Sequence, residues 1–241
     1  MKDIQSQRDS RRINIQKVGV KTVSYPITVR DKARREQHTI ATANMYVNLP
    51  HRFKGTHMSR FVEILNEFHG KIDINSFAVI LKKMKDRLEA EASHLEIEFP
   101  YFLEKAKNLD SRTLGHYRCL LHGSLNREED LLLTVEVPIS LPVVETTPRR
   151  LPGSFGRWGQ AEVNVRFRQF FWIEDLILLI EQEVEAEINH LLVKEHSVIS
   201  VEALTRRVGA CLEKIAAISW FSVTVHNFGD ECATFATVTS P

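Results

Sequence analysis

Three residues near the start of an expected helix have the chemistry to hold a phosphate group. His57, Ser59 and Arg60 come just before or at the beginning of a segment whose apolar residues recur at helical spacing from Phe61. The first amides of a helix have no partner within it, and a guanidinium binds phosphate oxygens in pairs, so this segment is a candidate substrate-binding site. The same residues can instead fix the loop and a subunit contact, and both interpretations stay open.

The cysteines and histidines give little indication of a metal site. No two cysteines form a CxxC pair, and their odd number and wide spacing fit a reduced compartment better than a disulfide framework. His190 and His196 are six residues apart, as are His116 and His122, whereas a helical metal pair needs a spacing of four. Glu231 and Cys232 are weak metal-ligand candidates that, with Asp230, would need a histidine from elsewhere. The cysteines are Cys119, Cys211 and Cys232.

Periodicity in the first half of the chain predicts the order β-β-α-α-β-β. Apolar residues alternate with polar ones in segments typical of strands, and between them they repeat at the three- and four-residue spacing typical of helices. Expected strands are 23–29, 41–49, 95–101 and 112–124, and expected helices are 61–68 and 77–88.

The second half repeats this order. Ser200 precedes the second of its two expected helices and is a suitable N-cap, because its hydroxyl can accept a hydrogen bond from a free amide. Expected strands are 131–141, 163–167 and two between 218 and 238, and expected helices are 173–188 and 201–215.

The repeated order indicates a duplicated α+β architecture. We expect a flexible N-terminal arm at 1–14, a first unit at 15–125 and a second unit at 126–241, which together form one bimodular domain. Each unit would be an antiparallel sheet with a helix pair on one face. Such sheets leave edges that must be paired or covered, so the pattern predicts a homo-oligomer, dimer or tetramer, in which sheets close into a barrel.

Composition excludes several classes of partner. The net charge of +1 produces no long-range field that attracts polyanions, so nucleic acid is not expected. No apolar run approaches the roughly 18 to 20 residues of a membrane span, and the first 14 residues are polar and charged. We therefore expect a cytoplasmic protein without a membrane partner.

Several motifs resemble those of one enzyme family, the type IB GTP cyclohydrolases, in the order in which they occur there. The resemblance implies the tunnelling fold (T-fold), with ligand sites at subunit interfaces. It also implies conversion of GTP and water to 7,8-dihydroneopterin triphosphate and formate, in folate biosynthesis, with a divalent metal such as zinc, manganese or iron. The motifs are 36–39, 44–50, 54–61, 99–102, 135–138, 172–177 and 227–228.

The resemblance is weakest where the family holds its metal. The family's cysteine would fall in 139–146, which contains no sulfur, and Trp158 stands where its histidine is expected. An indole nitrogen carries a donor hydrogen and cannot coordinate a cation. Glu195 is the remaining ligand candidate, and the family's final histidine motif corresponds to 229–235, in which both histidines are absent.

These differences predict a divergent member with a degenerate metal site and impaired or altered activity. No cofactor is expected in the usual site, while a purine or pterin can still bind. The substrate-binding candidates are His57, Ser59, Arg60 and Glu195, and the weak metal candidates are Glu195, Glu231 and Cys232.

Three alternatives remain. The chain can be a non-catalytic partner of an active paralogue, or an enzyme acting on a related pterin or deazapurine. A nitrile reductase of the same fold would need a cysteine after Pro138, where none is present.

Overall fold

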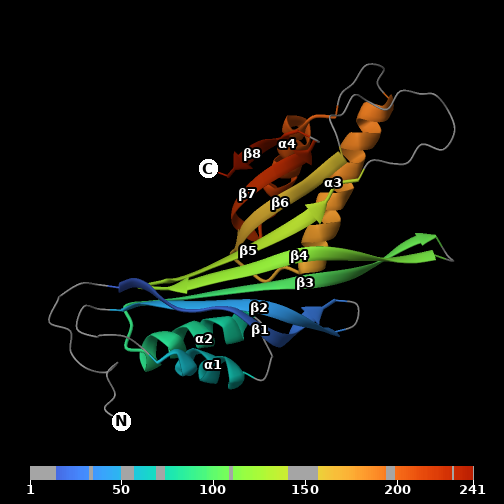
Figure 1. The fold of residues 1–241 in the computed structure, drawn as a ribbon. Coiled ribbons are helices and arrows are strands. Elements are labelled where there is room, and N and C mark those ends of the chain that lie inside the picture. Colours follow the sequence, from blue (N-terminus) through green and yellow to red (C-terminus); the bar gives the residue numbers. More distant parts are fainter. Residues whose placement is uncertain are drawn as a thin grey trace, which may run out of the picture. The chain divides into compact units, whose positions relative to one another are not determined.

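The structure is a computed structural model in which the described residues form eight strands and four helices. Their order along the chain is β1-β2-α1-α2-β3-β4-β5-β6-α3-α4-β7-β8 (Figure 1). The N-terminal arm predicted for 1–14 lies outside the described residues. Described are residues 15–32, 35–49, 57–68, 74–108, 111–140, 157–193, 199–229 and 231–240.

The strands form one sheet in which neighbours along the chain are also neighbours in space, in the order β1 to β8. The pairs β1–β2, β2–β3, β5–β6, β6–β7 and β7–β8 are antiparallel. The strands are β1 (Ile15–Asp31), β2 (Arg35–Leu49), β3 (Ala92–Asn108), β4 (Ser111–Leu125), β5 (Glu129–Pro138), β6 (Arg157–Phe167), β7 (Ile218–Phe228) and β8 (Ala233–Thr239). The helices are α1 (Met58–Asn66), α2 (Ile74–Arg87), α3 (Ile173–Val193) and α4 (Val201–Leu212).

The first compact unit contains residues up to 101 together with 120–132. Its core lies between the strands and helices α1 and α2 (Figure 1). Gly123 on β4 permits close packing, because a Cβ there would lie 2.3 Å from the ring of Phe77. Each large apolar side chain buried in this way contributes roughly 1.5 to 3 kcal/mol. The core includes Met45, Val47, Phe61, Ile64, Phe77, Leu81, Met84, Leu95 and Ile97, all fully buried.

The second compact unit contains residues 102–119 and 133–241. Helices α3 and α4 pack on one side of its strands, and α4 contacts β7 and β8. The predicted cap is confirmed, because the Ser200 hydroxyl accepts a hydrogen bond from the Ala203 amide at 3.2 Å. Its core includes Val135, Val163, Ile177, Ile180, Leu204, Val208, Val223 and Val225.

The predicted fold class needs correction. We expected tandem units, each with its own antiparallel sheet, joined as an oligomeric barrel, whereas the described strands belong to one eight-stranded sheet. Alternation along a strand shows which side chains face the core, but it does not show which strands pair. Strands β3 and β4 each contribute residues to both compact units, so the boundary at 125 and 126 stays a prediction.

Helix length and composition bear on the expected absence of a membrane partner. Among the described residues, no helix combines the length and apolar character needed to cross a membrane.

Candidate functional site

The residues predicted to hold a phosphate lie at the start of a helix, as expected. His57 is the N-cap of α1, and its side chain makes no capping hydrogen bond. The Arg60 amide donates to the His57 carbonyl at 3.2 Å, and the side chains of Ser59 and Arg60 are exposed. The helix start is thus confirmed as a structure, and its role in substrate binding stays a prediction.

Two of the three predicted metal candidates, Glu231 and Cys232, are exposed just before β8. The third, Glu195, lies outside the described residues. Within the described ranges, no three His, Cys, Asp or Glu side chains are placed so that they could hold a metal ion.

Trp158 lies on β6 opposite Asn227 of β7, beside a register shift that precedes Gln160. Its indole nitrogen is buried and has no hydrogen-bond acceptor among the described residues. Because this nitrogen carries a hydrogen, Trp158 can donate a hydrogen bond and cannot bind a cation.

A buried thiol and a buried carboxylate lie in the second unit. Cys119 on β4 is fully buried and Glu174 at the start of α3 is only 4% exposed. Burial raises the pKa of the Cys119 thiol, and the negative charges of Glu136 and Glu174 raise it further. The thiol therefore stays protonated and is unsuited to nucleophilic attack, which requires the thiolate.

The most connected polar group of the first unit surrounds Glu96 on β3. Asn44 Nδ2 donates to Glu96 Oε2 at 2.9 Å, and the Tyr46 hydroxyl donates to Glu96 Oε1 at 2.8 Å. Lys17 Nζ lies 3.8 Å from the centre of the Tyr46 ring. We call these residues, together with His94 and His122, the Glu96 cluster.

The sheet explains why these residues share a face. In the β2–β3 register Asn44 is opposite Glu96 and Tyr46 is opposite His94. Successive side chains of a strand point to opposite faces, so Met45 and Leu95, which are also paired, point into the core. The Glu96 cluster therefore lies on the face of these strands away from α1 and α2.

Opposing effects set the charge of Glu96. Burial alone would raise its pKa, but hydrogen bonds from Asn44 and Tyr46, with the nearby His122 and Lys17, bring the pKa below its usual value. For Tyr46, burial and then the bond to Glu96 raise the pKa well above its ordinary value. At neutral pH the pair is therefore a carboxylate and a neutral phenol.

Two histidines lie beside this carboxylate. The His94 ring stacks on Tyr46 with centroids 4.8 Å apart, and its Nε2 lies 3.3 Å from Asn48 Oδ1. Burial lowers the pKa of His94, as do the neighbouring His122 and Lys17. Nε2 of His122 is buried and has no hydrogen-bond partner among the described residues. A carboxylate beside imidazole nitrogens that can exchange a proton is suited to binding a polar ring and to acid–base chemistry.

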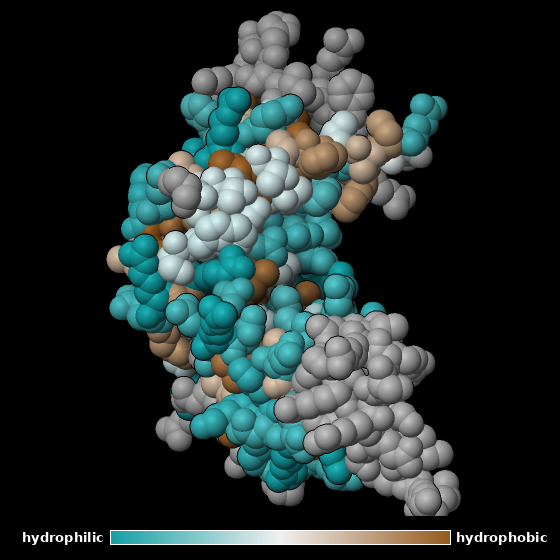
Figure 2. Space-filling view, turned by 90° about the vertical axis from the view of Figure 1, so that its left-hand side faces the viewer, coloured by the Kyte–Doolittle hydropathy of each residue, from teal (hydrophilic) through white to brown (hydrophobic). Residues whose placement is uncertain are grey.

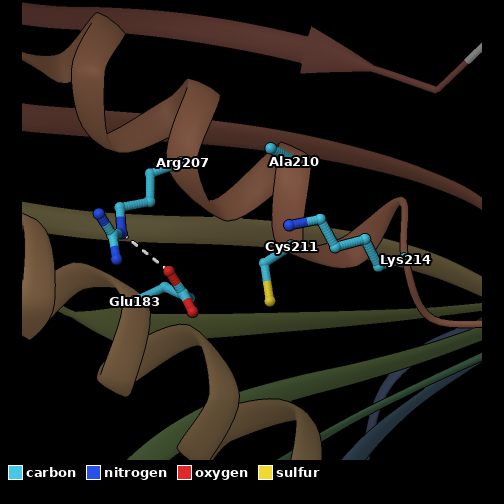
Figure 3. A pocket seen from close by; sticks show the side chains of 5 residues that line it. All are labelled: Glu183, Arg207, Ala210, Cys211 and Lys214. Atoms are coloured by element: carbon cyan, nitrogen blue, oxygen red, sulfur yellow. Dashed lines mark hydrogen bonds and ion pairs between the residues drawn. The ribbon is translucent and has the colours of Figure 1, made fainter.

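A groove between α3 and α4 is the remaining candidate (Figure 3). Its volume is about 340 Å³, and Arg207 Nε in its wall is paired with Glu183 at 2.8 Å. Burial raises the pKa of the Cys211 thiol that lines it, and Glu183 raises it further. Arg207 is paired with both Glu183 and Glu187, and the pKa of the thiol is raised, so we interpret this groove as structural.

Sequence reasoning missed the Glu96 cluster and Glu174. Asn44 and Tyr46 belong to the motif 44–50, and Glu174 belongs to the motif 172–177. Both motifs carried the family resemblance. The sequence pattern that could have indicated the Glu96 cluster is the polar face of two predicted strands. Every second residue from 44 to 48 and from 94 to 98 is polar or aromatic. Only the pairing register shows that these two faces adjoin.

Comparisons with known proteins identify the family. A family model described as "Type I GTP cyclohydrolase folE2" matches residues 1–229. The curated GTP cyclohydrolase FolE2 of Syntrophus aciditrophicus is 43% identical over 240 residues, covering 95% of this chain and 94% of the relative. That of Syntrophobacter fumaroxidans is 45% identical over 241 residues, covering 95% and 94%.

Solved structures show a similar fold at much lower identity. Uricase from Arthrobacter globiformis gives a TM-score of 0.52 at 9% identity, covering 92% of each chain. A mutant urate oxidase from Bacillus sp. TB-90 gives 0.56 at 9% identity, covering 94% of this chain and 99% of that one. The fold is accordingly described as uricase-like, which corrects the tunnelling-fold assignment.

These findings also correct the family expected from the motifs. The resemblance led to type IB and to a divergent member without the usual metal ligands, whereas the matching model and curated relatives carry the FolE2 description. They give no support to the expected degenerate site. The match over nearly the whole length shows that this chain belongs to the FolE2 family of GTP cyclohydrolases.

Proposed function

We propose that this chain converts GTP and one net water into 7,8-dihydroneopterin triphosphate and formate, at the start of folate and pterin biosynthesis. The observation that carries the proposal is the match of the FolE2 model to residues 1–229, together with FolE2 relatives that align over 95% of the chain. A fold likeness alone would not support a reaction, because one fold serves many functions.

GTP cyclohydrolases generally depend on a divalent metal, and the described residues do not by themselves provide a site for one. The predicted candidate Glu195 lies outside the described residues, as does most of 139–146, where the family's cysteine was expected and is absent. We therefore assign no step to a metal. The roles proposed below are for side chains of the Glu96 cluster, whose contacts the structure describes.

The Glu96 cluster supplies the groups that a guanine ring requires. Guanine presents two adjacent donors, N1–H and the 2-amino group, and a carboxylate has acceptor positions for both. Asn44 and Tyr46 each use one lone-pair position of Glu96 and leave others for a ligand. Because Glu96 is ionised, these bonds would be charge-assisted and about twice as strong as neutral ones.

His94 and His122 have the chemistry to move protons during ring opening. His94 is neutral at physiological pH because of its lowered pKa, so it can accept a proton. The unpartnered Nε2 of His122 offers a second site on the same face. Hydrolysis of the imidazole ring needs a proton on the departing ring nitrogen, and a positioned histidine typically contributes 10²- to 10⁴-fold to such a transfer.

Replacement of one carboxylate tests this proposal. The wild-type chain is assayed with GTP and, separately, zinc, manganese or ferrous iron, measuring formate and the fluorescent neopterin obtained by oxidising the product. Glu96→Gln keeps the shape and removes the charge, and should lower kcat/KM by roughly 10- to 100-fold, because a hydrogen bond to a charged group is worth about 1.5 to 3 kcal/mol. Glu98→Gln on the same strand is the matched control and should keep wild-type activity.

Two results would contradict the proposal. If no formate formed with any of the metals, the chain would not catalyse this reaction. If Glu96→Gln kept wild-type activity, the Glu96 cluster would have no part in it. Circular dichroism of each variant separates loss of activity from loss of fold.

A further inference from the structure

Two residues other than glycine have a positive φ among the described residues, and they occur in different settings. Glu89, with a φ of 47°, lies just after α2, where a left-handed residue commonly ends a helix. Thr22, with a φ of 56°, lies within β1. A β-branched side chain is strongly disfavoured in this conformation, and residues held in it cluster at functional sites.

The conformation of Thr22 belongs to a β-bulge that faces Asn44. Between Val20 and Val23, β1 has two residues where β2 has only Asn44. Bulges of this kind are common beside active sites, where they re-aim a side chain. Thr22 is exposed, so burial of its side chain does not offset the cost of the left-handed conformation.

The main-chain amide of Thr22 holds the side chain of Asn44. It donates a hydrogen bond to Asn44 Oδ1 at 2.9 Å. The Asn44 carboxamide has one oxygen, which accepts, and one nitrogen, which donates. Because Thr22 holds the oxygen, the nitrogen faces Glu96 and donates to Glu96 Oε2 at 2.9 Å. The Thr22 amide thus determines which atom of Asn44 the carboxylate meets.

The two donors to Glu96 act on different oxygens of the carboxylate. Asn44 donates to Oε2, and the Tyr46 hydroxyl donates to Oε1 at 2.8 Å. Two such bonds fix the plane of the carboxylate, whereas one bond alone leaves it free to turn about its last side-chain bond. The unused acceptor positions of both oxygens therefore keep a constant direction. A ligand with two adjacent donors requires both positions at once.

The surface of the molecule also favours polar ligands. On the side drawn in Figure 2 the described residues are mostly hydrophilic, and hydrophobic areas are scattered among them. A continuous apolar area would indicate an apolar partner. Where recognition depends on a few polar groups, their orientation decides which ligand binds.

We propose that Thr22 is a positioning residue of the Glu96 cluster, whose amide fixes Asn44 and so sets the carboxylate to select a ring with two adjacent donors. The inference rests on the proposed function, in which Glu96 binds guanine. Guanine has both donors, whereas hypoxanthine has N1–H and lacks the 2-amino group. Loss of the bond between Thr22 and Asn44 should therefore weaken binding of GTP more than binding of ITP.

Thr22→Pro tests this role because proline has no amide hydrogen and cannot adopt a positive φ. Isothermal titration calorimetry with GTP and with ITP measures the two dissociation constants without requiring turnover. A hydrogen bond to a charged group is worth about tenfold or more in a binding constant. We expect the wild type to bind GTP about tenfold more tightly than ITP, and Thr22→Pro to lose most of this preference. A lower folded fraction would weaken both nucleotides equally.

Three variants serve as controls. Thr22→Gly keeps the amide and tolerates a positive φ, so the preference for GTP should be retained. Glu89→Pro makes the same change at an exposed residue whose amide donates to the Asp86 carbonyl, and it should lower stability without changing the preference. In Asn44→Ala, which should itself lose the preference, adding Thr22→Pro should have no further effect, because Thr22 acts through Asn44.

Hydrogen exchange tests the bond itself and decides the outcome if Thr22→Pro does not fold. The Thr22 amide should be protected in the wild type and exchange faster in Asn44→Ala. Equal exchange in these two proteins would overturn the proposal, as would equal weakening of GTP and ITP in a folded Thr22→Pro variant.

Failure of the proposed function would give a different result. Glu96→Gln would then bind GTP and ITP as the wild type does, and no guanine site would remain for Thr22 to position. If Glu96→Gln lost the preference for GTP while Thr22→Pro kept it, the guanine site would stand and the role of Thr22 would be wrong.

Discussion

The faces of the two units that lie away from their helices use polar residues in different ways. In the first unit, Asn44 and Tyr46 hold the ionised Glu96, and His94 stacks on Tyr46. In the second unit, the corresponding face of β7 and β8 carries neutral contacts such as the hydroxyls of Thr224 and Thr237, 2.9 Å apart. The face of the first unit concentrates a charge among partners. The β7–β8 part of the face of the second unit presents hydroxyl groups, and its ion pair of Arg118 and Glu136 lies on β4 and β5.

This difference separates two kinds of functional surface. Holding a carboxylate partly out of water is unfavourable unless donors offset the loss of hydration, so such a group indicates selection for a ligand or for chemistry. A neutral, hydroxyl-rich face next to an open strand edge requires no such compensation.

Loss of one donor to Glu96 should have the largest effect on stability. Tyr46→Phe leaves a partly buried carboxylate oxygen without this hydrogen bond and should lower the free energy of unfolding by about 1 to 3 kcal/mol. Urea denaturation at pH 7.5 measures the change. Tyr25→Phe, which loses a 3.1 Å bond to the Leu65 carbonyl, is the control and should cost about 1 kcal/mol or less, because its acceptor is uncharged. Equal losses for the two variants would show that the Glu96 cluster is an ordinary hydrogen-bonded surface.

Sequence periodicity predicted the helices and strands well because it reports directly on burial. The apolar residues within 41–47 and 95–101 are those that the structure buries, and Ser200 caps α4 as expected. It did not predict the single sheet, because strand pairing depends on contacts between segments far apart in the chain.

The same limit explains what was missed at the candidate site. Asn44 and Glu96 are 52 residues apart and meet only through the register of β2 and β3. The expected metal ligands fall at motif positions in 139–146 and at Glu195. Those positions depend on the resemblance, whereas the Glu96 cluster depends on tertiary structure.

The pH dependence of stability should reveal His94. Its pKa is lowered in the folded chain, chiefly by burial, from an ordinary value of 6.5. Above that pH the ring is neutral in both states and contributes nothing. As pH falls below it, the unfolded chain takes up the proton first, so the folded state loses stability, by up to about 1.4 kcal/mol per unit of pKa difference.

Thermal melts between pH 7.5 and 5 measure this loss, and His94→Gln should remove most of it. Glu96 affects stability in a different pH range. The pKa of Glu96 is also lowered, and the stability that this carboxylate contributes is lost only as pH falls below its ordinary value of 4.5. If the melting temperature of His94→Gln fell with pH as steeply as that of the wild type, another histidine would be responsible for the loss.

The smallest effect is expected on the neutral face. Thr224→Val removes one of two hydroxyls that bond to each other in an exposed position, and the remaining Thr237 hydroxyl can bond to water. The free energy of unfolding should change by no more than about 0.5 kcal/mol, since surface substitutions away from special features rarely exceed that. Urea denaturation at a concentration where the chain is monomeric gives the value. A loss as large as that of Tyr46→Phe would mean that the two faces are equally specialised, and the contrast between a face that holds a charge and a face that holds only hydroxyl groups would fail.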